Sequence, residues 1–146
     1  MHKLRRHHSA VIITLLAAAI TVGVIFILFG SDSKINQSNL DFIRSFGWEI
    51  KESPEQISHI TIPQEFNLIF ETYNKLENNA GFDLSGHRGE KAVRYSYIVT
   101  NHKASPSGLI RANVYITKCG IVAGDICSLE LGGFIQSIND TTGMVE

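Results

Sequence analysis

Hydrophobic residues follow two patterns along this chain: one unbroken apolar run near the start, and short periodic segments after it. The run covers residues 10–29, AVIITLLAAAITVGVIFILF, and contains no charged residue, no proline and no amide. As a helix, a run of this length rises about 30 Å, which is the thickness of a bilayer's hydrocarbon core. Backbone groups in lipid must be hydrogen-bonded within their own segment, so the run predicts a single transmembrane helix.

The residues before the run predict its orientation. Residues 1–9 contain three basic residues and no acidic one, and basic segments stay on the cytoplasmic side of a membrane. We therefore expect a cytoplasmic N-terminus and an extracytoplasmic remainder. A cleaved signal peptide and a buried soluble helix are the alternatives. The run is longer than the roughly 7–15 apolar residues of a signal peptide, and Leu28 and Phe29 stand where small residues would be needed, so an uncleaved anchor is favoured.

The rest of the chain has room for one domain. We assign the polar residues 30–37 to a linker, residues 38–138 to an extracytoplasmic domain and residues 139–146 to a frayed tail. A segment of about 100 residues can form one modest hydrophobic core, so no second domain is expected.

A short helix is predicted at the start of this domain. Ser38 or Asn39 would be its N-cap, and Gly47 would end it. Trp48, the only tryptophan, is expected to pack this helix onto the rest of the domain. The apolar residues at helical spacing are Leu40, Phe42, Ile43 and Phe46.

The next segment predicts two strands and a second helix. The strands are expected at residues 48–51 and 57–62. Pro63 suits the first turn of a helix, and the glycine-rich residues 81–89 predict the loop that follows this helix. The apolar stripe of the helix, at spacings of three and four, is Phe66, Ile69, Phe70, Tyr73 and Leu76.

Alternating apolar and polar residues predict three further strands, at 92–100, 109–117 and 121–127. A tight turn at residues 118–120 would join the last two as a hairpin. We therefore expect an antiparallel meander covered on one face by the second helix, which is an α+β domain. Residues 128–138 are expected to end the fold, with one helical turn among them.

The charge of the domain excludes one class of partner. Three of the 13 Lys and Arg residues precede the apolar run, so residues 10–146 hold ten basic residues against 14 acidic ones. Nucleic-acid binding needs a basic surface, so we expect no nucleic-acid partner.

Charged residues inside the predicted strands indicate a candidate polar pocket. Arg94, Arg111 and Asp125 are each flanked by apolar residues, and neighbouring strands would bring them together. One arginine could then form a half-buried ion pair with Asp125, which would be a structural role. In the functional alternative they form a small pocket with Asn113 and Tyr115 on the face of the sheet that the second helix leaves uncovered. An arginine fork there would suit a carboxylate or phosphate.

Cys119 and Cys127 are the only cysteines. The predicted hairpin separates them by roughly 20 Å at about 3.3 Å per residue, too far for a disulfide within one molecule. Cys119, in the turn, is a candidate exposed thiol that could pair two copies. Neither the cysteines nor the scattered histidines have the spacing of a zinc site or a catalytic pair, so we expect no metal, cofactor or catalytic residue.

Five sequence blocks together resemble one protein family, the bacterial domain of unknown function 4830 (DUF4830). The resemblance implies a small membrane-anchored protein from Gram-positive bacteria, and it implies no activity. The blocks are FIRSFGWEI (42–50), TIPQEFNLIFETYNKL (61–76), GFDLSGHRG (81–89), VRYSYIV (93–99) and GDICSLELGGF (124–134).

These observations favour a membrane-tethered binding module of the cell envelope, with an unidentified envelope protein or ligand as partner. A structural subunit that pairs through its span or through Cys119 is the first alternative. An envelope-acting enzyme centred on Arg94, Arg111 and Asp125 is the second.

Overall fold

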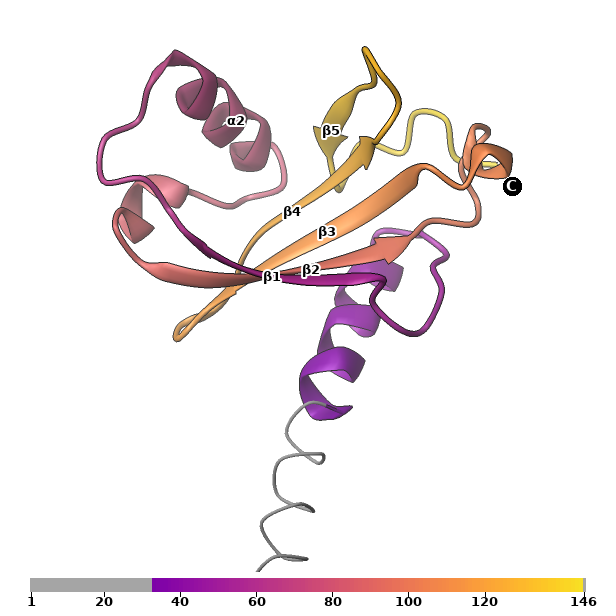
Figure 1. Ribbon diagram of the computed structural model, residues 1–146, viewed down its shortest axis with the longest axis horizontal. Coiled ribbons are helices and arrows are strands. Elements are labelled where there is room, and N and C mark those ends of the chain that lie inside the picture. The colour runs from indigo at the N-terminus through magenta and orange to yellow at the C-terminus, as the bar shows by residue number, and fades with distance from the viewer. Residues whose placement is uncertain (1–32, 146) are drawn as a thin grey trace, which may run out of the picture. The chain divides into compact units, whose positions relative to one another are not determined.

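The computed structural model describes residues 33–145, and those from Ser38 onward belong to one compact unit. This unit is a five-stranded sheet with helical segments on its two faces (Figure 1). All neighbouring strands are antiparallel and follow one another in chain order. The predicted α+β class and antiparallel meander are therefore confirmed. The strands are β1 (Gln56–Thr61), β2 (Lys91–Ile98), β3 (Ile110–Thr117), β4 (Gly120–Ser128) and β5 (Ile135–Ser137).

The strand register places chemically different side chains on the two faces of the sheet. Ser96 of β2 lies opposite Asn113 of β3, which in turn lies opposite Asp125 of β4. Alternate residues of a strand point to the same side, so Arg94 and Arg111 share this face with them. The residues between them are mostly apolar and form the other face.

The apolar face is closed by the helical residues 38–45 and by Trp48. Leu40 and Ile43 of this helix and Trp48 are buried together with the apolar side chains of β2, β3 and β4. The Trp48 indole N–H donates to the Ile138 carbonyl at 2.7 Å. Trp48 thus joins the helix to the sheet, as predicted from the sequence, and we call this side the closed face.

The polar-bearing face is covered by α2 (Leu68–Asn78) and by η1 (Leu84–His87), a short 3-10 turn (Figure 1). The prediction that the polar residues lie on an uncovered face is wrong, because Tyr73 of α2 contacts Asp125 and both faces of the sheet are covered. A second, smaller apolar cluster lies beneath α2 and η1, and the candidate site lies on this side. We call it the pocket face. The buried members of the cluster are Ile62, Leu84, Ala92, Val122 and Ala123.

The second helix begins at Leu68 and not at Pro63. The side chain of Asn67 accepts a hydrogen bond from the Phe70 N–H at 2.9 Å and caps the helix there. Asparagine is a strong N-cap, and this cap determines the start of the helix in place of the proline. The predicted stripe is correct only in part, because Ile69 is 80% exposed.

The first helix begins before the predicted start at Ser38 or Asn39, because residues 33–37 are already helical. They contain neither glycine nor proline, and polar residues alone do not stop a helix. Asn39 is consequently not an N-cap. It lies buried inside the helix, and its Nδ2 donates to the Tyr97 hydroxyl at 3.1 Å.

Two further predictions are corrected. Residues 48–51 form no strand, only the single bridge between Ile50 and Val99. Residues 128–138 contain the strand β5 and no helical turn, because two consecutive glycines allow a tight turn that brings β5 back onto β4.

The end of the domain is held in place, against the prediction of a frayed tail. Met144 forms a bridge with His102, and the Val145 N–H donates to the Asn101 carbonyl at 2.7 Å. Residues up to 145 therefore form part of the packed domain.

The predicted transmembrane helix at residues 10–29 lies outside the described residues, as does the basic segment before it. Within residues 33–145, no helix has the length and hydrophobicity needed to cross a bilayer.

Candidate functional site

A pocket of about 690 Å³ lies between α2 and the pocket face of the sheet. Its walls are mainly aliphatic side chains from α2, from β1 and from the loop that holds Leu84. Leu68 and Ile69 line it and are also 78% and 80% exposed, so they stand at its rim. This volume is within the range of about 300–1,000 Å³ that is usual for small-molecule sites.

Four lining residues carry polar side-chain atoms: Thr72, Tyr73, Arg94 and Tyr115. The Thr72 hydroxyl donates to the Leu68 carbonyl within the helix at 2.8 Å. The Tyr73 hydroxyl donates to Asp125 at 2.9 Å. Burial raises the pKa of Tyr73 and of Tyr115, so both phenols stay protonated.

Arg94 differs from the other three. Its Nε is buried and has no hydrogen-bond partner among the described residues. The register places Arg94 opposite Tyr115 on the floor of the pocket. A buried guanidinium N–H without an acceptor is costly, so Arg94 is the polar group of this pocket that can still bind an oxygen ligand.

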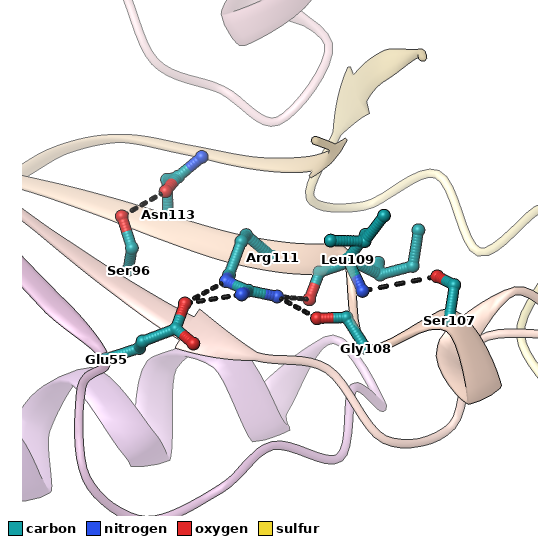
Figure 2. A network of polar contacts seen from close by, with 8 residues as sticks. Glu55, Ser96, Ser107, Gly108, Leu109, Arg111 and Asn113 are labelled. Carbon is teal, nitrogen blue, oxygen red and sulfur yellow. Dashed lines mark hydrogen bonds and ion pairs between the residues drawn. The ribbon is translucent and has the colours of Figure 1, made fainter. Parts of the chain in front are cut away.

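A buried hydrogen-bond network lies beside the pocket. The Asn113 amide donates to one Asp125 oxygen at 2.7 Å, and the Tyr73 hydroxyl donates to the other at 2.9 Å. The Ser96 hydroxyl donates to Asn113 at 2.6 Å (Figure 2). Burial raises the pKa of Asp125, and the hydrogen bonds from Asn113 and Tyr73 oppose this rise. The network runs from β2 to α2 and fixes the position of the helix.

Glu77 provides a second polar link from α2 to the sheet. One oxygen of its carboxylate accepts the Gly124 N–H of β4 at 2.8 Å, and the other is buried with no hydrogen-bond partner in the part of the chain that the structure describes. Burial raises the pKa of Glu77 to about 7, and the nearby Asp125 adds to the rise. The sequence analysis missed Glu77, since a glutamate next to an apolar stripe is usually exposed.

The structure does not bring Arg111 to the pocket or into an ion pair with Asp125. Its guanidinium binds the Glu55 carboxylate through Nε at 2.6 Å and through a second nitrogen (Figure 2). The same guanidinium donates to the Gly108 carbonyl at 2.7 Å. Arg111 is therefore a structural residue, and the five predicted pocket residues divide into lining (Arg94, Tyr115), network (Asp125, Asn113) and distant (Arg111).

Both cysteines are free. Cys119 is exposed at the β3–β4 turn, where the sequence analysis placed it. Cys127 is half-buried, and its sulfur lies 3.3 Å from the Asn113 amide nitrogen. Burial raises the pKa of Cys127, and the charge of Asp125 raises it further, so this thiol is a poor nucleophile.

The fold and the pocket together define a small α+β domain with a ligand-sized cavity beneath a helix. The chain belongs to the family described as domain of unknown function (DUF4830), whose family model matches residues 42–126. This match confirms the resemblance drawn from the sequence, and the matched segment includes α2 and Arg94. No curated protein and no solved structure matches the chain.

Proposed function

We propose that this chain is a membrane-tethered, extracytoplasmic binding module of a bacterial cell envelope, and that its ligand occupies the pocket beneath α2. The pocket itself is the observation that carries the binding role, because it combines apolar walls with an arginine whose Nε has no hydrogen-bond partner among the described residues. Such a combination is typical of ligand sites. The tethering rests on the apolar run at residues 10–29.

The hydrogen bonds of the titratable groups near the pocket favour binding over catalysis. Tyr73 and Asp125 bind each other, and Glu77 binds the backbone of Gly124. These groups hold α2 on the sheet, and a role in proton transfer would require them to leave those bonds. The enzyme alternative predicts that Asp125→Asn abolishes an activity, whereas the binding module predicts an effect on stability alone.

The pocket can be tested with a small apolar photoprobe, a trifluoromethyl-phenyl-diazirine, applied to the full chain in its membrane. Labelling is expected on the tryptic peptide 52–75, which carries most of the pocket-lining residues. It should exceed the labelling of peptide 35–44, which carries Leu40 and Ile43 of the closed face. Ile69→Asp should reduce the labelling of peptide 52–75 several-fold. Leu131→Asp is the matched control, since Leu131 is an equally apolar, fully exposed residue outside the pocket. Equal labelling of both peptides would refute a binding pocket.

The location can be tested separately with protease added to whole protoplasts. A tethered outer domain should be degraded while residues 1–29 stay with the membrane. A domain that survives this treatment, or a full-length chain found wholly in the soluble fraction, would refute the proposed location.

The alternative of a subunit paired through Cys119 is favoured by one observation, the exposure of this thiol at a hairpin turn. Non-reducing gels of membrane fractions should then show a dimer that disappears in Cys119→Ser. Identical bands for the two proteins would remove this alternative.

A further inference from the structure

The charge of Arg94 is not balanced by an ion pair within the pocket. No carboxylate of residues 33–145 forms a salt bridge with it. Asp125 is close enough to Arg94 for the two charges to attract, and this attraction opposes the rise in the pKa of the Asp125 carboxyl. The Asp125 oxygens accept their hydrogen bonds from Asn113 and from Tyr73, so they accept none from the Arg94 Nε. The attraction to Asp125 offsets part of the hydration that the Arg94 guanidinium loses, and a ligand oxygen would supply the hydrogen-bond acceptor that is still lacking.

Arg111, the other arginine on this face, has a partner of the kind that Arg94 lacks. Arg111, which is equally part of the sheet, has the Glu55 carboxylate bound to its guanidinium. Arg94 lies in the register position between β1 and β3 where its neighbours are Ser58 and Tyr115, and neither carries a negative charge. Arg94 Nε therefore lacks the kind of acceptor that Glu55 gives to Arg111, which is an anionic oxygen.

The walls of the pocket define the rest of the ligand. Leu68, Ile69 and Ile135 line the pocket and are 49–80% exposed. Exposed aliphatic side chains that gather around a cavity favour an apolar ligand that covers them. The ligand must then combine an anionic end with an apolar body.

We propose that the pocket binds an anionic amphiphile, with a carboxylate or phosphate head on the Arg94 guanidinium and an apolar tail against the Leu68, Ile69 and Ile135 side chains. This inference rests on the proposed binding function and specifies its ligand class. A guanidinium pairs with either head group through two parallel N–H donors, so both sources share one recognition chemistry.

Photoreactive lipids provide the test, again with the full chain in its membrane. A diazirine-bearing palmitate is compared with the diazirine-bearing hexadecanol, which has the same tail and an uncharged head. Palmitate is expected to label peptide 52–75 at concentrations about tenfold lower than hexadecanol, which corresponds to one charge-assisted hydrogen bond. Competition by unlabelled palmitate or by lysophosphatidate then shows whether the carboxylate or the phosphate head is preferred.

Arg94→Gln should weaken palmitate labelling about tenfold and leave hexadecanol labelling unchanged. Arg94→Lys keeps the charge without the fork and should give an intermediate value. Arg44→Gln is the control, because Arg44 is a surface arginine whose ion pair with Glu52 at 3.7 Å lies away from the pocket. Thermal unfolding of each variant shows that the fold is retained.

The outcomes separate the two proposals. Equal labelling by palmitate and hexadecanol, or palmitate labelling that is unchanged in Arg94→Gln, would overturn the anionic head while the pocket remains a binding site. Failure of the apolar photoprobe and of both lipids would overturn the binding function as well. A crosslink that joins two copies through residues 68–75 would make this face an interface between chains and would also overturn the inference.

Discussion

The two faces of the sheet are covered in different ways. On the closed face, helical residues and Trp48 meet the strands through apolar contacts, and Ile43, Tyr97 and Ile138 are completely buried. On the pocket face, α2 is held by two polar links near its C-terminal half, through Tyr73 and Glu77. In its first turn, the Leu68 and Ile69 side chains are exposed to solvent.

The difference separates stability from binding within one small domain. Apolar packing stabilises a fold in proportion to the area it buries. The apolar residues of the closed face are buried and therefore stabilise the fold. The pocket face leaves apolar area exposed, and the Arg94 Nε has no acceptor among the described residues. Both features cost stability that a ligand would restore. The predictions that follow test this division, from the largest expected effect to the smallest.

Truncation on the closed face should have the largest effect. Trp48→Ala removes a fully buried ring and its hydrogen bond to the Ile138 carbonyl, so the free energy of unfolding should fall by about 3–5 kcal/mol. Urea unfolding followed by circular dichroism measures this. Leu131→Ala, at a fully exposed position, should change it by less than about 0.5 kcal/mol. A loss below about 1 kcal/mol for Trp48→Ala would contradict the assignment of stability to this face.

Glu77 should make stability fall as pH rises. Its carboxyl titrates near 4.5 when unfolded and at about 7 in the fold. Between these values the folded chain binds more protons than the unfolded chain, so stability is full below about pH 4.5 and is lost as the pH rises through 7. The loss should be about 2–3 kcal/mol.

Unfolding free energies at pH 5 and pH 8 measure the Glu77 effect. Glu77→Gln should remove most of the difference, whereas the raised pKa of Asp125 contributes with the same sign and leaves a remainder. An unchanged difference in Glu77→Gln would show that the pH dependence has another source.

Tyr73→Phe should have a smaller effect that is confined to the pocket face. It removes the hydroxyl donor to the buried Asp125 carboxyl, and the expected loss of stability is about 1–3 kcal/mol. Amide hydrogen exchange should accelerate in α2 more than in the helical residues 38–45. Equal acceleration in both helices would mean that the two faces are not stabilised separately.

The smallest stability effect is expected at the rim of the pocket. Leu68→Ser removes a side chain that is 78% exposed, so the free energy of unfolding should change by less than about 0.5 kcal/mol. Labelling of the pocket by the apolar photoprobe should nevertheless fall, because Leu68 forms part of its wall. A large loss of stability would show that Leu68 is a core residue.

Much of the sheet could be predicted from the sequence, because strict alternation leaves one register in which the apolar residues share a face. The position of β1, β2, β3 and β4 followed from this pattern. The start of α2 could not, because Pro63 and Asn67 are both good helix-start residues and the choice between them depends on tertiary contacts.

The site was harder to predict because it too depends on tertiary contacts. Arg94 and Arg111 look alike in the sequence, each a charged residue within an apolar strand. They differ in the structure because Glu55, 56 residues away in the sequence, binds the Arg111 guanidinium. Glu77 likewise meets Gly124 over a separation of 47 residues. Local periodicity contains no information about such pairs.

The β3–β4 turn has a practical consequence for spectroscopy. Cys119 is exposed there, whereas Cys127, the only other cysteine, is half-buried with a raised pKa. At neutral pH a maleimide reagent should therefore modify Cys119 selectively, without any engineered cysteine. A single fluorophore or spin label can thus be attached to the unaltered chain, at the turn of the β3–β4 hairpin, to report on its surroundings in the cell.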